Sequence, residues 1–134
     1  MKTTYETQQW GIRSASFWMT LLVAAGIIFI GVRFIVSPGA GAAGYGIPLI
    51  SNDDLPFGRI KGIRDIFSGV ALLPLLLLRM RKATAWVFTS AIVVPAADFL
   101  IVLSANGSSD ISHLMIHGST VAYMAITSFL LFKS

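Results

Sequence analysis

The sequence lacks cysteine and has few charged residues. None of its 134 residues is cysteine, and only 12% are charged. The first absence excludes disulfide bonds, thiolate nucleophiles and thiolate metal ligands within this sequence, and it leaves the redox compartment undetermined. The second, together with 55% hydrophobic residues and a mean hydropathy of +0.78, excludes an ordinary soluble domain.

The net charge of +4 does not form a nucleic-acid surface. The basic residues are dispersed among long apolar runs, without a basic stripe that carries interleaved aromatic residues. We therefore interpret this charge as a determinant of membrane orientation.

Long hydrophobic runs recur along the chain and predict its fold. About 20 apolar residues cross the hydrocarbon core of a bilayer. We predict an all-α membrane protein, a four-transmembrane-helix bundle that forms one domain over residues 1–134, with spans at 16–36, 62–78, 83–103 and 111–132. The first span is longer than the apolar core of a signal peptide, which favours an uncleaved anchor.

The segment 37–58 between the first two spans is predicted to be a long Gly/Pro-rich loop. Its three prolines and five glycines are expected to break any helix. Its apolar side chains favour a loop that lies on or dips into the membrane interface, and a plain surface connection is the alternative.

The basic residues favour one orientation. Six of the ten Lys and Arg residues fall on the side that holds both termini and the turn between the second and third spans: Lys2, Arg13, Arg79, Arg81, Lys82 and Lys133. The other four are Arg33, Arg59, Lys61 and Arg64. Because the cytoplasmic side carries the excess of Lys and Arg, both termini are expected to be cytoplasmic in a multi-pass protein of the cell membrane.

Ionisable residues of all four spans fall in one leaflet once the helices alternate in direction. These residues are Arg33, Arg64, Asp65, Asp98, His113 and His117. Charge within a bilayer is tolerated when it faces partners or a cavity. The pattern predicts one shared polar pocket in the extracytoplasmic half, roofed in part by segment 37–58.

Catalytic roles are predicted for Asp98, His117 and His113. Asp98 follows Pro95, where the third span is expected to kink, and the two histidines share a helix face and titrate near neutrality. The alternatives are structural pairing of Asp98 with an arginine, capping hydrogen bonds for the histidines, and a metal triad of the three residues; no metal is expected. The predicted substrate-binding residues are Arg33, Arg64, Asp65, Tyr45 and Lys61.

The order of several short motifs resembles that of a known family. The motifs are Arg33-Phe34 followed by Pro38, Tyr45-Gly46-Ile47-Pro48, Lys61-Gly62-Ile63-Arg64-Asp65, Pro95 with Asp98, and His113. In this the chain is similar to the short integral membrane proteins of domain-of-unknown-function family 4267. The resemblance implies four helices, and fungal members among natural-product biosynthesis genes would favour an enzyme acting on a lipophilic intermediate.

Three functions remain open from the sequence. The first is an intramembrane enzyme of isomerase or cyclase type that uses acid–base chemistry on a lipophilic small molecule. The others are a non-catalytic protein that binds a lipid or accessory partner, and a small proton-coupled transporter. Membrane lipids and a lipophilic small molecule are the expected partners; no nucleic acid and no cofactor is expected, and assembly into a homo-oligomer is left open.

Overall fold

The computed structural model describes residues 10–133, and within that range every regular element is helical. The elements are α2 (Ala15–Val36), α3 (Pro38–Tyr45), the short 3₁₀ helix η1 (Asn52–Asp54), α4 (Leu55–Leu77), α5 (Arg81–Ala91), α6 (Val93–Asn106) and α7 (Ile111–Lys133). The predicted all-α class is confirmed.

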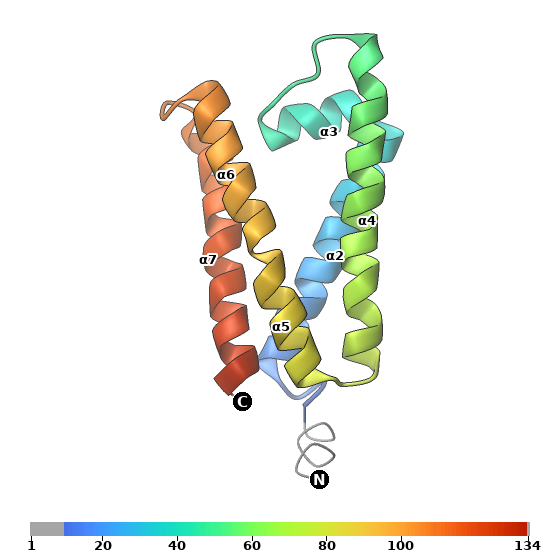
Figure 1. Ribbon diagram of the computed structural model, residues 1–134, viewed down its shortest axis with the longest axis vertical. Helices are drawn as coiled ribbons and strands as arrows, with labels where there is room; N and C mark the ends of the chain where they lie inside the picture. Colours follow the sequence, from blue (N-terminus) through green and yellow to red (C-terminus); the bar gives the residue numbers. More distant parts are fainter. Residues whose placement is uncertain (1–9, 134) are drawn as a thin grey trace.

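The long helices run back and forth along one axis (Figure 1). The start of α2, the turn between α4 and α5 and the end of α7 lie at one end, which we call the basic end because Arg79, Arg81, Lys82 and Lys133 are there. Helix α3 and the turn between α6 and α7 lie at the other end, and α3 runs across the long axis (Figure 1).

Three helical stretches are long and apolar enough to cross a membrane. They are α2, the stretch Arg81–Asn106 that joins α5 to α6, and α7. These contain the first, third and fourth predicted spans and support a membrane protein. The second predicted span, 62–78, lies within α4 except for Leu78, which follows the helix. Helix α4 has 23 residues but is not among the three, since its first half carries Arg59, Lys61, Arg64 and Asp65.

The prediction that segment 37–58 contains no helix was wrong. Pro38 begins α3 and Pro56 lies in the first turn of α4, where the missing N–H has no partner within the helix and therefore costs nothing. The glycines of α3 allow close packing on α2, because a Cβ atom at Gly41 would lie 2.9 Å from the Phe34 ring. Gly46, with φ of 110°, ends the helix in the left-handed region that glycine adopts without strain.

Helices α2 and α4 form the most extensive contact between elements. A Cβ atom at Gly31 would lie 2.6 Å from the Gly62 carbonyl oxygen, and the reverse substitution gives the same distance. Gly69 likewise leaves no room for a side chain against the Ala24 carbonyl oxygen. Small residues thus bring the two backbones into direct contact, as at many helix interfaces in membranes.

Helices α5 and α6 continue one another across a break at Ile92. Pro95 has no N–H to donate to the carbonyl of Ala91, and the Ile92 N–H bonds Thr89 three residues back, in the manner of a tighter turn. The helix is therefore interrupted close to Pro95, the region where a kink was expected. Beyond it, α6 and α7 lean away from α4 toward the end at which α3 lies (Figure 1).

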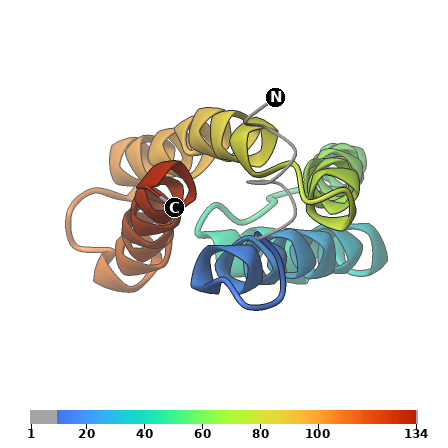
Figure 2. The same cartoon turned by 90° about the horizontal axis from the view of Figure 1, so that it is seen from below.

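The basic end is closed by an apolar core with a few polar links. The core consists of Trp10, Ala24, Leu72, Leu76, Ala85, Phe88, Met124 and Leu131. Buried Arg81 donates from Nη1 to the Leu131 carbonyl oxygen of α7 at 3.0 Å, and the hydroxyls of Thr89 and Ser128 are hydrogen-bonded. Seen from this end, α2, α4, α5 and α7 stand around a common centre (Figure 2). The basic end is thus packed, whereas the helices diverge toward the α3 end (Figure 1).

Candidate functional site

Tyr45, the last residue of α3, meets both α6 and α7. Its hydroxyl donates to Asp98 Oδ1 at 2.7 Å. Its backbone carbonyl oxygen lies 2.8 Å from His117 Nε2, and the two rings meet edge to face with centroids 4.8 Å apart. Because a carbonyl oxygen only accepts, His117 Nε2 carries the proton in this contact. Tyr45 thus forms hydrogen bonds with two of the predicted catalytic residues, one on α6 and one on α7.

The Tyr45 hydroxyl is held in its protonated form. Burial raises the pKa of the phenol, and the hydrogen bond to Asp98 raises it further, because the phenolate would face a carboxylate. At neutral pH the Tyr45 hydroxyl is therefore a hydrogen-bond donor.

Lys61 and Asp65 form an ion pair one helical turn apart on α4. Lys61 Nζ lies 2.6 Å from Asp65 Oδ2, and it also stands over the rings of Phe34 and Tyr45, at 4.7 and 5.2 Å from their centroids. Asp65 is 8% exposed, so the ammonium group offsets much of the cost of taking its carboxylate out of water. The Lys61 ammonium of α4 therefore lies over the ring of Tyr45, and the hydroxyl of the same tyrosine bonds Asp98.

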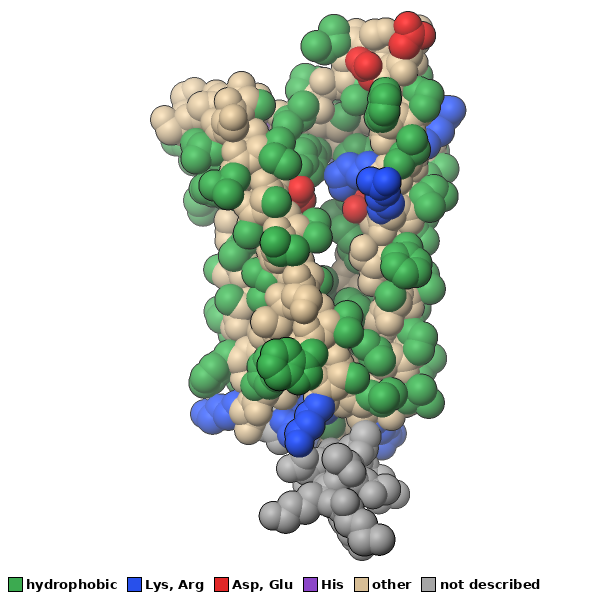
Figure 3. Space-filling view, viewed as in Figure 1, with side chains coloured by type: hydrophobic (Ala, Val, Ile, Leu, Met, Phe, Trp, Pro, Cys, Tyr) green, Lys and Arg blue, Asp and Glu red, His purple; other side chains and the backbone are tan. Residues whose placement is uncertain are grey.

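A hollow lies between α6 and α4. In the space-filling view, an acidic side chain over α6 faces basic and acidic side chains over α4 beside an opening (Figure 3). The one acidic residue within α6 is Asp98, and α4 contains Asp65 together with the basic residues Arg59, Lys61 and Arg64. Hydrophobic side chains surround the opening on this face, as expected for a surface that meets lipid (Figure 3).

His113 belongs to a different group, at the turn between α6 and α7. Its Nδ1 lies 2.8 Å from Asp110 Oδ1, and Asn106 donates from Nδ2 to Asp110 Oδ2 at 2.7 Å. The hydrogen bonds from Asn106 and then His113 lower the pKa of Asp110. Asn106 Nδ2 also donates to the Gly46 carbonyl oxygen, so this group contacts the end of α3 next to Tyr45.

Arg33 and Arg64 are exposed. The Arg33 guanidinium lies beside Gly44 of α3, where an added Cβ atom would be 3.5 Å from Nη1. Among residues 10–133, neither arginine forms an ion pair with Asp98 within 4 Å. The hydrogen-bond partner of Asp98 is the Tyr45 phenol, so the carboxylate has a neutral partner where the sequence suggested a cationic one.

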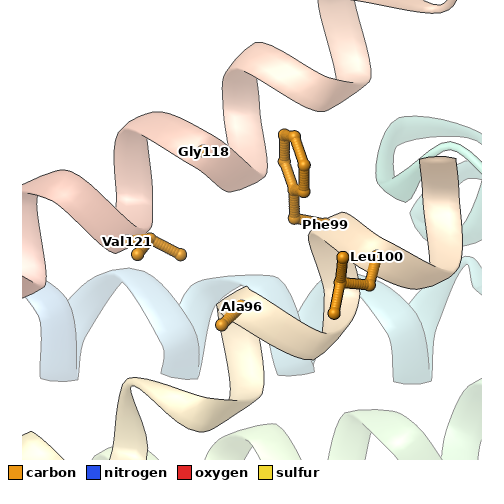
Figure 4. Close-up of a pocket in the computed structure, with 5 residues that line it drawn as sticks. All are labelled: Ala96, Phe99, Leu100, Gly118 and Val121. Carbon is orange, nitrogen blue, oxygen red and sulfur yellow. The ribbon is translucent and has the colours of Figure 1, made fainter. Parts of the chain in front are cut away.

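A separate apolar groove lies between α6 and α7 (Figure 4). It encloses about 360 Å³ and is lined by Ala96, Phe99, Leu100, Gly118 and Val121. None of these side chains is polar, and Tyr45, Asp98 and Lys61 do not line it. Within residues 10–133 there is also no group of three His, Asp or Glu residues placed to hold a metal ion.

Comparison with known proteins places the chain in a family. The model of the family described as "Domain of unknown function (DUF4267)" matches residues 24–131. The chain belongs to this family. No curated protein and no solved structure gives a match. The DUF4267 match spans all the residues of the site, and it confirms the resemblance drawn from the sequence motifs.

Sequence reasoning missed Asn106 and the pairing of Lys61 with Asp65. Asn106 and Gly107 form a dipeptide that is typical of turns. The sequence therefore offers no reason to expect the Asn106 side chain to bond α3. The pairing had a usable signal, because residues four apart on a helix are neighbours and opposite charges at that spacing attract.

Proposed function

We propose that this chain is a four-span membrane enzyme that performs acid–base chemistry on a lipophilic molecule bound in the hollow between α4 and α6. The supporting observation is the Tyr45 phenol, which is hydrogen-bonded to Asp98 and lies under the Lys61 ammonium at an opening bordered by hydrophobic side chains. A carboxylate base, a phenol that donates a hydrogen bond and an ammonium cation, all partly shielded from water, are groups that suit catalysis by proton transfer.

The proposal takes α4 as the fourth span. Its 23 residues reach about 34 Å at ~1.5 Å per residue, which is enough for the hydrocarbon core. It lies in backbone contact with α2, a clear span, over most of its length. Of its charges, Lys61 and Asp65 neutralise each other, and exposed Arg59 and Arg64 lie in the half near the membrane surface, which their long side chains reach.

The basic end is proposed to face the cytoplasm. Arg79, Arg81, Lys82 and Lys133 cluster there, whereas the turn between α6 and α7 at the other end contains no Lys or Arg. With this orientation the hollow opens in the extracytoplasmic half of the membrane, and the beginning and end of the helical region are cytoplasmic. Lys2 lies outside the described residues.

The proposed reaction is the shift of a proton within the substrate. The Asp98 carboxylate takes a proton from a carbon that lies between a carbonyl group and a C=C double bond of the substrate, and the electrons of the broken C–H bond move into the carbonyl to form a dienolate. Once Asp98 is protonated, the Tyr45 hydroxyl turns to the negative oxygen, which Lys61 also stabilises. Asp98 then returns the proton to the far carbon of the former C=C bond, so the double bond shifts into conjugation with the carbonyl, the product is an isomer, and no oxidant or reductant is consumed.

The remaining predicted site residues are given supporting roles. Exposed Arg33 and Arg64 are proposed to bind the polar head of the substrate or of a neighbouring lipid, as guanidinium groups bind carboxylates and phosphates. His117 and His113 lie at the junction of α3 with α7. His117 is proposed to assist proton movement through its other ring nitrogen, Nδ1.

A second candidate is a protein that binds a lipid without converting it. Among the described residues no buried side-chain nitrogen or oxygen lacks a hydrogen-bond partner. A cluster whose members satisfy one another also serves to order a bundle, and this observation favours the non-catalytic function.

Solvent deuterium distinguishes the two. Purified protein in lipid nanodiscs is incubated in D₂O with a membrane lipid extract, and carbon-bound deuterium in the lipids is measured by mass spectrometry. An Asp98 base predicts protein-dependent deuterium, reduced about 10²-fold or more in Asp98→Asn and unchanged in the control Leu76→Met. A lipid retained by the protein in native mass spectrometry, without any protein-dependent deuterium, would favour the binding function and overturn the enzyme.

A further inference from the structure

Helix α3 is joined to the rest of the chain by non-helical residues at both ends. Ser37 alone separates it from α2, with φ of −139° and ψ of 75°. At the other end Gly46 adopts φ of 110°, and the residues that follow have no regular structure until Ser51 begins the 3₁₀ turn. The helix lies across the end of the bundle between α2–α4 and α6–α7 (Figure 1).

The end of α3 contacts α6 and α7 through three hydrogen bonds and a ring contact. The bonds run from the Tyr45 hydroxyl to Asp98, from His117 Nε2 to the Tyr45 carbonyl oxygen, and from Asn106 Nδ2 to the Gly46 carbonyl oxygen. The rings of Tyr45 and His117 also meet edge to face. The last carbonyl groups of a helix have no partners within it, so the donors from His117 and Asn106 satisfy groups that otherwise need water. These hydrogen bonds therefore hold α3 when it is docked. When it is not docked, water can bond the same donors and acceptors.

The other side of α3 packs on α2 and α4 through close backbone contacts. A Cβ atom at Gly41 would meet the Phe34 ring at 2.9 Å, and one at Gly58 would meet Pro38 Cβ at 2.8 Å. On the same side the Arg33 guanidinium lies beside Gly44, and the Lys61 ammonium stands over the Tyr45 ring, but neither forms a hydrogen bond with α3. The two sides of α3 thus differ, with close packing on α2–α4 and hydrogen bonds to α6–α7.

We propose that α3 is a lid over the hollow, seated on α2 and α4 and released from α6 and α7 when its three hydrogen bonds open. Release would part the Tyr45 hydroxyl from Asp98 and open a path from the membrane between α4 and α6. A membrane-dissolved amphiphile could enter there without crossing the closed basic end. The lid concerns access to the site and does not depend on the chemistry proposed above.

Asn106 permits a test that leaves the acid–base groups intact. Because the sequence has no cysteine, cysteines at exposed Ala43 of α3 and Ser104 of α6 can be spin-labelled, and their separation measured by double electron–electron resonance. A second labelled pair, Val32 of α2 and Ile63 of α4, reports on the two helices on which α3 packs. The wild-type background should give one narrow distribution for each pair.

The lid predicts that Asn106→Ala adds a longer Ala43–Ser104 distance. The ratio of released to docked molecules should rise about five- to tenfold, the effect of one hydrogen bond, while the Val32–Ile63 distribution stays narrow. Ser112→Ala is the matched control, since Ser112 bonds Asp110 in the same turn without touching α3, and it should change neither pair.

Reactivity of Asp98 provides a second measurement. Dicyclohexylcarbodiimide, which attacks carboxyl groups from the membrane, should label Asp98 faster in Asn106→Ala than in wild type by the same factor. Equal distances and equal labelling in wild type and Asn106→Ala would overturn the lid, as would equal broadening of both labelled pairs. A moving lid without deuterium transfer would retain the lid and reject the enzyme.

Discussion

The backbone contact between α2 and α4 predicts a large difference between two glycine-to-alanine substitutions. In Gly62→Ala the new Cβ atom would lie 2.6 Å from the Gly31 carbonyl oxygen and 2.9 Å from Ile35 Cγ1. Ordinary contacts of this kind begin near 3.4 Å. A carbonyl oxygen within a helix cannot rotate away, so the two helices must separate. Overpacking of this kind costs about 1–3 kcal/mol of unfolding free energy.

Gly26→Ala is the matched control on α2. Nothing lies within 4 Å of a Cβ atom at Gly26, so this substitution should be neutral or stabilise by up to about 1 kcal/mol through the better helix propensity of alanine. Unfolding of both variants by SDS titration in mixed micelles measures the difference. Equal stabilities for Gly62→Ala and Gly26→Ala would show that α2 and α4 are not in backbone contact. The positions of Lys61 and Asp65 relative to α2 and α3 would then be wrong.

Three further predictions test other parts of the structure. Lys61→Met leaves the Asp65 carboxylate unpaired and should cost about 1–2 kcal/mol by SDS titration, below the ~3–5 kcal/mol of fully buried pairs since the Lys61 side chain keeps 32% exposure; an unchanged stability would argue against the ion pair. The lowered pKa of Asp110 means that its stabilising effect is fully present above the ordinary value of 3.8 and is lost as the pH falls from there through the lowered value. The advantage of wild type over Asp110→Asn should therefore shrink steadily as the pH is lowered from about 4, and an advantage that stays constant over that range would contradict the assignment. An impermeant maleimide added outside cells should label a cysteine at Ser108 and should not label one at Lys82, which is expected to react only from the inside. The reverse result would overturn the proposed topology.

The membrane class and the helix boundaries follow from the sequence to different extents. The apolar runs of α2, α6 and α7 carry no ambiguity, because only a helix satisfies backbone groups within lipid. The start of α4 could not be predicted in the same way. Its first two turns contain Pro56 and two glycines and carry the charges of Arg59 and Lys61, and they pack against α2 and α3.

Residues at the same depth in one leaflet can be predicted to be neighbours, but the hydrogen-bond partner of each cannot be predicted in this way. The sequence places Asp65, Asp98 and His117 at similar depth, and the structure brings them to the two sides of Tyr45. Which partner each would take depended on α3, a helix that was expected to be a loop. Once Gly46 and Pro38 are recognised as helix ends, the last residue of α3 is directed at α6 and α7, and a phenol takes the place expected for an arginine.

The contact of Tyr45 with Asp98 is the central element of both proposals, and a double-mutant cycle tests it most directly. Unfolding free energies are measured for wild type, Tyr45→Phe, Asp98→Asn and the double variant. A hydrogen bond from a phenol to an ionised carboxylate predicts a coupling of about 1.5–3 kcal/mol, whereas the control cycle of Tyr45→Phe with Leu76→Met should give a value near zero. A coupling near zero for Tyr45 and Asp98 as well would mean that α3 does not meet α6, and it would contradict the site and the lid together.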